Sequence, residues 1–187
     1  RSLAEGADVI VNTDADNQYD ARDIPLLVAP ILERRAEFVV GDRPIATIAH
    51  FSWSKRRLQQ LGSWVVRLAS GTSVLDAPSG LRALSREAAL RINVFDDYTY
   101  TIESILQAGL SGMRITSVPI RVNGETRPSR LIRSNAGYIL RIGRSILRTF
   151  FIYKPGRSFF LLSLAPAAIG LVLVLRWIWL YYTGPLN

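Results

Sequence analysis

The sequence predicts an α/β fold with a mostly parallel sheet flanked by helices, then a basic amphipathic helix and a C-terminal transmembrane helix. Three observations support this architecture. Short apolar runs that end in polar turns alternate with segments of helical period over most of the chain. The last third of the chain contains Lys and Arg but no acidic residue. A long uncharged apolar run lies near the C-terminus.

Three segments have the pattern of strands. Residues 7–16, ADVIVNTDAD, contain a short apolar run that ends in acidic residues. Residues 37–42, EFVVGD, form a second apolar run that ends in a turn. Residues 114–122, RITSVPIRV, carry alternating apolar positions, as expected for a strand with one buried face.

Helical segments separate these strands, at residues 23–36, 53–71, 85–92 and 100–112. Asp23 and Pro25 begin the first helix, and Pro30 is expected to bend it. Gly71 is expected to end the second helix, and Ser85 to cap the third. The alternation of strands and helices predicts crossover connections and a largely parallel sheet.

The composition excludes several kinds of site. The 187 residues are enough for one domain with a sizeable core, and they contain no Cys and a single histidine, His50. Disulfides, thiolate chemistry, a histidine metal cluster and a Ser-His-Asp hydrolase are therefore not expected, and His50 receives no role. The chain does not begin with Met, and its pattern begins within a domain, so we expect N-terminal strands to precede it.

Positive charge is concentrated in the C-terminal part. Residues 1–125 hold 14 Lys or Arg and 15 Asp or Glu, whereas residues 126–187 hold 9 Lys or Arg and no acid. An anionic partner is therefore expected for the C-terminal part, either nucleic acid or an anionic membrane surface.

The apolar run favours the membrane. Residues 159–175 contain no charged side chain, and with Arg176 snorkelling the stretch continues to Tyr182. A helix of this length spans about 36 Å, against about 30 Å for a hydrocarbon core. Trp and Tyr side chains gather at its C-terminal end, as in an interfacial aromatic belt. The alternative is a buried core helix.

A basic amphipathic segment precedes this span. Residues 133–153 place apolar side chains on one half of a helix and Arg141, Arg144 and Arg148 on the other. Beside a span, such a helix is expected to lie among lipid headgroups, and the alternatives are nucleic-acid binding or an ordinary surface helix. The basic block predicts residues 1–157 on the cytoplasmic side of a cell membrane.

The acidic exit of the first strand is a candidate metal site. Asp14, Asp16 and Gln18 alternate in an extended segment and can share a face. Close carboxylates repel unless a cation lies between them, and Mg²⁺ takes one or two carboxylates together with substrate phosphate. A calcium loop does not fit, because Tyr19 and Pro25 stand where Gly and Glu are needed. The alternative is a turn that merely caps the next helix, a role expected of Asp20 and Asp23.

Five segments, in order, resemble family 2 glycosyltransferases, the polyprenyl-phosphate sugar transferases similar to dolichol-phosphate mannosyltransferase. They are VNTDADNQY, VVGDR, LDAPSGLRALSRE, ESILQAGLSGMRITSVPIRV and GETRPSRL, and the resemblance covers about residues 7–157. Arg130 stands where the family commonly has Lys. The resemblance implies a GT-A-like fold whose N-terminal strands precede this chain, so that the fragment itself is expected to be inactive. Residues 1–125 would be the C-terminal portion of the catalytic domain, residues 126–157 a basic loop and interfacial helix, and residues 158–183 the span.

The resemblance also implies roles for individual residues. Asp14, Asp16 and Gln18 would hold Mg²⁺ or Mn²⁺ on the diphosphate of a nucleotide sugar. Phosphate of donor or acceptor would be contacted by Arg43, Arg57, Arg127, Ser129 and Arg130. A solvated helix face is the alternative for Arg57, and membrane headgroups are the alternative for Arg127 and Arg130.

The remaining candidates concern the acceptor. Asp76 would orient or deprotonate it as the catalytic residue, with a turn residue as the alternative. Ser79, Gly80 and Glu103 are acceptor-site candidates, and Glu103 has an ion pair with an arginine as its alternative. Asp96 and Asp97 are expected to cap the following helix.

The function implied by the resemblance is inverting transfer of a hexose from a nucleotide-diphosphate sugar to a membrane polyprenyl phosphate. Its partners would be the donor, the lipid acceptor and membrane lipids, without nucleic acid. Two alternatives stay open at this point. One is a non-catalytic membrane scaffold with a degraded site, and the other is a different metal-dependent phosphoryl or nucleotidyl transferase.

Overall fold

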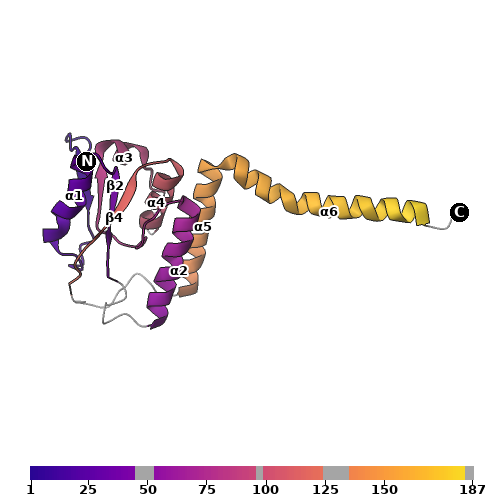
Figure 1. The fold of residues 1–187 in the computed structure, drawn as a ribbon, viewed down its shortest axis with the longest axis horizontal. Coiled ribbons are helices and arrows are strands. Elements are labelled where there is room, and N and C mark those ends of the chain that lie inside the picture. The colour runs from indigo at the N-terminus through magenta and orange to yellow at the C-terminus, as the bar shows by residue number, and fades with distance from the viewer. Residues whose placement is uncertain (45–52, 96–98, 124–134, 184–187) are drawn as a thin grey trace. The chain divides into compact units, whose positions relative to one another are not determined.

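The computed structural model describes residues 1–44, 53–95, 99–123 and 135–183. It divides into two compact units, Arg1–Thr149 and Phe150–Asn187. The first unit contains every strand of the described chain (Figure 1). The expected domain boundary at residue 125 falls outside the described residues and stays a prediction.

A four-stranded mixed sheet with the order β1-β3-β2-β4 forms the centre of the first unit. The strands are β1 (Val9–Asn12), β2 (Phe38–Asp42), β3 (Arg82–Ser85) and β4 (Ile115–Pro119). β2 and β4 pair in parallel, and β3 pairs antiparallel with both β1 and β2. Three of the four strands therefore run in one direction, and β3, which was not predicted, runs against them, so one of the three pairings is parallel and the sheet is mixed.

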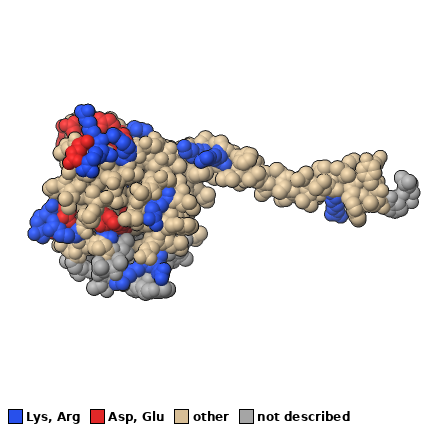
Figure 2. Space-filling view, in the orientation of Figure 1, with Lys and Arg blue, Asp and Glu red and all other residues tan. Residues whose placement is uncertain are grey.

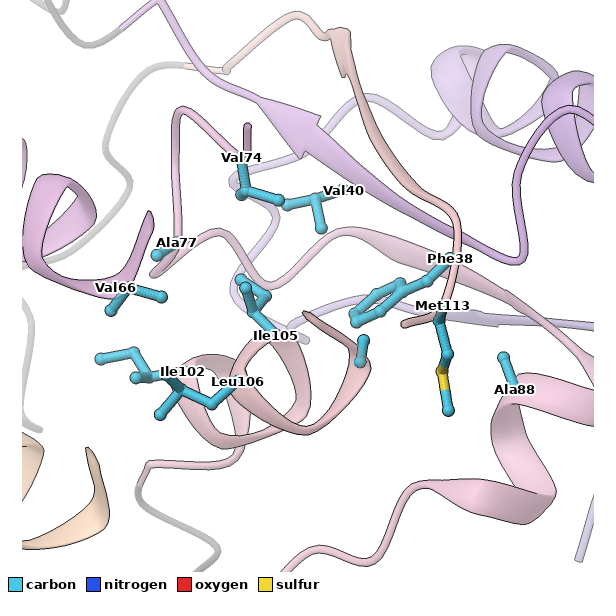
Figure 3. Close-up of a cluster of buried hydrophobic side chains, with 11 residues drawn as sticks. Phe38, Val40, Val66, Val74, Ala77, Ala88, Ile102, Ile105, Leu106 and Met113 are labelled. Carbon is cyan, nitrogen blue, oxygen red and sulfur yellow. The ribbon is translucent and has the colours of Figure 1, made fainter. Parts of the chain in front are cut away.

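The alternation of side chains along β2 creates a core on each face of the sheet. Val39 packs on one face with Leu27 and Ile31 of α1 (Ile24–Leu32). Phe38 and Val40 point to the other face, where they meet side chains of α2 (Trp53–Ser70) and α4 (Tyr100–Leu110) (Figure 3). In Figure 1, α1 lies on one side of the sheet and α2 and α4 on the other, so the unit is a three-layer α/β/α arrangement.

The helices follow the signals in the sequence. They are η1 (Ala21–Asp23), α1, α2 (Trp53–Ser70), α3 (Arg86–Arg91), α4 (Tyr100–Leu110), α5 (Asn135–Tyr153) and α6 (Pro155–Thr183). Gly71 ends α2 with a positive φ of 69°, a backbone conformation that glycine adopts readily. The Ser85 side chain accepts a hydrogen bond from the Ala88 N–H and caps α3, as predicted. Pro30 lies inside α1.

α5 packs on the first unit more closely than its amphipathic pattern predicts. Ile142 and Ile146 pack against the core cluster, whereas Leu140 and Leu147 are 74% and 61% exposed. Arg148 was expected on the polar face with the other arginines. Instead it donates to the Glu103 carboxylate at 2.8 Å, because α4 presents this acid fully buried beside it. The apolar half of α5 therefore divides between the core and an exposed stripe.

α6 is the one helix in the described part of the chain that is long and apolar enough to cross a membrane. It has 29 residues, its most apolar 18-residue window has a mean hydropathy of 2.4, and 6% of that window is buried. A buried core helix therefore does not describe it. Figure 2 shows few charged side chains along its visible face. The break expected at YKPG is present, since α5 ends at Tyr153 and α6 begins at Pro155.

The close approach of α2 and α4 gives a stability test. A Cβ atom at Gly109 of α4 would collide with the backbone carbonyl of Ser70, whereas one at Gly62 of α2 would meet nothing within 4 Å. We expect Gly109→Ala to lower the free energy of unfolding by about 1–3 kcal/mol through overpacking. Gly62→Ala should raise it by up to about 1 kcal/mol through helix propensity. Thermal unfolding of both variants measures the difference, and an equal response of the two would contradict it.

Candidate active site

The acidic loop follows the C-terminal end of β1 and exposes two carboxylates. Asp14 and Asp16 are both exposed, and the loop turns at Asn17, which has a φ of 60°. The Asp16 Oδ1 accepts a hydrogen bond of 3.0 Å from the Gln18 N–H, which stabilises this turn. The loop lines a hollow of about 320 Å³ together with Tyr19 and Leu81. Ligands of open α/β sheets bind at such strand ends.

Asp14 packs against a second loop, residues 76–80, that precedes β3. A Cβ atom at Gly80 would overlap the Asp14 carboxylate, so a larger residue there would displace this side chain from its present position. The Gly80 N–H donates to the Tyr19 hydroxyl oxygen at 2.7 Å, which holds the two loops together. The Tyr100 hydroxyl donates to Asp14 Oδ1 at 3.0 Å. Burial, and then the nearby Asp14 charge, raise the pKa of Tyr100 to about 12, so it stays a hydrogen-bond donor near neutral pH.

Arg43 and Asp76 form a buried ion pair behind the acidic loop. The Arg43 Nε and Nη2 donate to the two Asp76 oxygens at 2.5 and 2.9 Å, and its backbone N–H donates to the same carboxylate at 3.3 Å. Asp76 is fully buried and Arg43 is 7% exposed. The Arg43 Nη1 also donates to Gln18 Oε1 at 3.2 Å. Burial lowers the pKa of Arg43, but the hydrogen bonds and charge of Asp76 outweigh it and raise that pKa.

Arg82 is a second buried cation, and it fixes the backbone of the 76–80 loop. Its guanidinium donates to the carbonyl oxygens of Ala77 and Ser79, both at 2.7 Å, and to the Thr101 carbonyl at 2.6 Å in the first turn of α4. Burial lowers the pKa of Arg82 to about 10, so it stays positively charged at neutral pH. Arg82 therefore joins the loop beneath Asp14 to the beginning of α4.

The two later acids of the segment have structural roles. Asp20 caps η1 by accepting from the Arg22 N–H, as predicted. Asp23 precedes α1 but caps it with no side-chain hydrogen bond; it is 1% exposed and instead accepts from the Arg121 backbone and guanidinium. Hydrogen bonds from Arg121 lower the pKa of Asp23, although burial opposes this shift. Asp20 and Asp23 thus differ from Asp14 and Asp16, which face outward.

The structure brings together only part of the predicted site. Asp14 lies against Gly80, beside the buried Ser79, and Gln18 connects to the Arg43–Asp76 pair. Arg57 is exposed on α2. Both Glu103 oxygens accept hydrogen bonds, one from Arg148 and one from the Phe95 N–H. Glu103 therefore forms the ion pair with an arginine that was the alternative to an acceptor-site role. Arg127, Ser129 and Arg130, together with His50, Asp96 and Asp97, lie outside the described residues.

Four residues around Asp14 were missed by the sequence analysis. They are Asn12, Tyr19, Tyr100 and Arg82. Arg82 ends the segment DAPSGLR, so its place in the motif was a usable signal. The two tyrosines carried none, because their contacts with residues 61 and 86 positions away depend on the tertiary fold.

The donor set fits a divalent cation that takes few protein ligands. The described residues contain no group of three or more His, Cys, Asp or Glu side chains that would enclose a metal ion. Two exposed carboxylates beside an amide oxygen are instead the kind of set that Mg²⁺ or Mn²⁺ uses when water and substrate phosphate complete its coordination. Asp14, Asp16 and Gln18 are the ligands expected from the sequence, and their binding of a metal stays a proposal.

No protein-family model matches the chain. An uncharacterised glycosyltransferase of Mycobacterium tuberculosis is 32% identical over 145 residues, which cover 74% of this chain and 65% of the relative. An undecaprenyl-phosphate mannosyltransferase of Micrococcus luteus is 27% identical over 68% of this chain and 56% of its own length. A dolichyl-phosphate hexose transferase of Haloferax volcanii is 28% identical over 78% and 63%, respectively. The chain thus spans about half to two thirds of these relatives.

Solved structures show the same fold. Glucosyl-3-phosphoglycerate synthase from Mycobacterium tuberculosis, in complex with phosphoglyceric acid, has a TM-score of 0.57 and 19% identity over 81% of this chain and 52% of that chain. Its complex with Mn²⁺, uridine diphosphate and phosphoglyceric acid has a TM-score of 0.56. The chain is therefore related to glycosyltransferases that include polyprenyl-phosphate sugar transferases, and its fold is GT-A-like, as the motifs indicated.

The two buried acids of the site region should differ in their contribution to stability. Asp76→Asn leaves Arg43 buried without a counter-charge, and we expect a loss of about 3–5 kcal/mol. Asp23→Asn should cost less, about 1–2 kcal/mol, because the Arg121 side chain is 57% exposed and water can solvate it. Chemical unfolding of the two matched variants measures which of them loses more free energy of unfolding. A larger loss for Asp23→Asn would contradict the greater importance of the Arg43–Asp76 pair.

The Asp23–Arg121 pair also predicts a dependence on pH. The folded-state pKa of Asp23 lies below the unfolded value near 3.8, so its stabilisation is present above that value and disappears as the pH falls through the folded pKa. The difference in melting temperature between the wild type and Asp23→Asn should therefore be constant from about pH 7 to 5 and shrink below about pH 4. Melting curves at each pH measure it, and a difference that grows on acidification would be inconsistent with the lowered pKa.

Proposed function

We propose that the whole protein transfers a hexose from a nucleotide-diphosphate sugar to a polyprenyl phosphate at a membrane, with inversion at the anomeric carbon and dependence on Mg²⁺ or Mn²⁺. The observation that carries the proposal is the pair of exposed carboxylates, Asp14 and Asp16, at the end of β1. Relatives named as undecaprenyl-phosphate mannosyltransferase and dolichyl-phosphate hexose transferase support the lipid acceptor. A similar structure holding Mn²⁺ and uridine diphosphate supports the donor and the metal.

In this proposal Asp14, Asp16 and Gln18 would hold the cation. When bound, it would supply Lewis-acid stabilisation of the charge that develops on the leaving diphosphate. Gln18 is held by Arg43, so its amide oxygen has a fixed direction, and the Arg43 charge lies behind the loop. Arg57, Arg127, Ser129 and Arg130 are proposed to contact phosphate, for which guanidinium groups are well suited.

Asp76 is proposed to position Arg43 and not to remove a proton. Asp76 is fully buried, and both its oxygens accept from Arg43, so a substrate hydroxyl has no open carboxylate to approach. A phosphate monoester acceptor is mostly dianionic at neutral pH, because its second pKa is about 6. Its oxygen can bond to the anomeric carbon while the bond to the diphosphate breaks and the nucleoside diphosphate leaves with the electron pair. No general base is needed for this step.

The lipid acceptor gives a reason for the C-terminal part of the chain. α6 offers a span, and the exposed Leu140 and Leu147 on α5 offer apolar contact with a bilayer surface. Lys154 and Arg157 flank the beginning of α6, and we propose that they lie at the cytoplasmic surface. The polyprenyl phosphate would then be presented to the catalytic domain from the same membrane.

Two neighbouring acids test the metal assignment. Asp16→Ala should reduce release of nucleoside diphosphate at least a hundredfold, because it removes a ligand of the catalytic cation. Asp20→Asn should keep turnover within about threefold, since Asn also caps a helix. The assay uses the full-length protein in membranes with polyprenyl phosphate, Mn²⁺ or Mg²⁺ and a panel of nucleotide sugars. Turnover retained in Asp16→Ala would contradict the assignment of Asp16 as a metal ligand. If the wild type turned over none of the donors, the alternative of a non-catalytic scaffold would be favoured.

A further inference from the structure

Tyr100, the first residue of α4, makes a polar contact with the acidic loop that the expected ligand set does not include. Its hydroxyl lies 3.0 Å from Asp14 Oδ1 and 3.4 Å from the Asn12 Nδ2. Asn12 is the last residue of β1, two positions before Asp14. Among the described residues, Tyr100 is the one that donates a hydrogen bond to the Asp14 carboxylate.

The direction of this hydrogen-bond chain follows from the chemistry of its groups. A phenol has a single proton, and a carboxylate can only accept. The Asn12 amide donates to the hydroxyl oxygen, so the phenolic proton is free to point at Asp14. Gly80 lies against the same carboxylate, nearest to its Oδ2. The Asp14 side chain is therefore held by a hydrogen bond to Oδ1 and by contact with the Gly80 backbone.

The beginning of α4 is itself rigidly supported. Thr99 is 1% exposed, and its hydroxyl donates to Ser145 of α5 at 3.3 Å. The Arg82 guanidinium lies 5.9 Å from the centre of the Tyr100 ring and donates to the Thr101 carbonyl. These contacts restrict the Tyr100 ring, while its hydroxyl reaches Asp14 of the acidic loop. A ligand held by such an outer contact loses less freedom when it binds a cation.

We propose that Tyr100 is a positioning residue for the metal site: its hydroxyl holds one oxygen of Asp14 so that the carboxylate is oriented for a divalent cation before the cation arrives. This inference rests on the proposed function, because it requires Asp14 to be a metal ligand. Outer-sphere partners of metal ligands commonly change metal affinity by ten- to a hundredfold. The Tyr100 effect should fall at the lower end, since the contact is a single neutral donor.

The test is Mn²⁺ binding by the full-length protein in detergent with uridine or guanosine diphosphate present, measured from the electron paramagnetic resonance signal of free Mn²⁺. Tyr100→Phe removes only the hydroxyl and should raise the dissociation constant of Mn²⁺ about tenfold. Its melting temperature without metal should stay close to that of the wild type. Asn12→Ala, a second variant in the same chain of hydrogen bonds, should raise the dissociation constant about two- to threefold. Tyr181→Phe, which removes an exposed hydroxyl on α6, is the matched control and should bind as the wild type does.

The outcomes separate the inference from the proposed function. If the wild type binds Mn²⁺, Asp16→Ala abolishes binding and Tyr100→Phe binds within twofold of the wild type, the role of Tyr100 is overturned and the proposed function stands. A lower melting temperature in Tyr100→Phe without a change in Mn²⁺ affinity also overturns it, since the hydroxyl would then be structural only. If the wild type binds no Mn²⁺, or Asp16→Ala binds normally, the metal assignment fails and this inference fails with it.

Discussion

The buried ion pair between Arg43 and Asp76 is the interaction on which the arrangement of the site depends. A buried charge is costly unless it is paired and hydrogen-bonded, and here three donors of Arg43 reach one carboxylate. The pair joins the end of β2 to the beginning of the 76–80 loop. This loop carries Gly80, against which Asp14 packs, and Arg43 also holds Gln18. The orientation of the acidic loop thus follows from a charge pair behind it.

Arg82 extends this dependence to the helices. It binds two carbonyl oxygens of the 76–80 loop and one in the first turn of α4, so the loop and the helix cannot move apart without exposing a buried cation. α4 in turn contacts α5 through an ion pair between Glu103, which is fully buried, and Arg148 of α5. A continuous set of polar contacts therefore links the acidic loop to the helix that precedes the apolar span.

The local features of the chain were predictable, and the distant contacts were not. The Gly71 stop, the Ser85 cap and the acidic end of β1 depend on nearby residues, so sequence patterns indicate them. β3 was missed because RALS is short and contains a charged residue, and its pairing with β1 and β2 is decided by the fold. The same reason applies to Tyr100, which meets Asp14 across 86 positions. Arg148 has the helical position of a surface residue, and its ion pair with the buried Glu103, together with the Phe95 ring beneath its guanidinium, depends on the fold.

The burial of Asp76 narrows the chemistry that this site can perform. A carboxylate that is fully buried, with both oxygens hydrogen-bonded to an arginine, is a poor base because no substrate can reach it. A sugar-hydroxyl acceptor would need such a base, whereas a phosphate acceptor arrives already ionised. In the proposed function, charge neutralisation then becomes the main requirement, and a cation on the acidic loop would supply it, because the Arg43 charge is already paired with Asp76. The burial of Asp76 is therefore a reason to propose an anionic acceptor and not an alcohol.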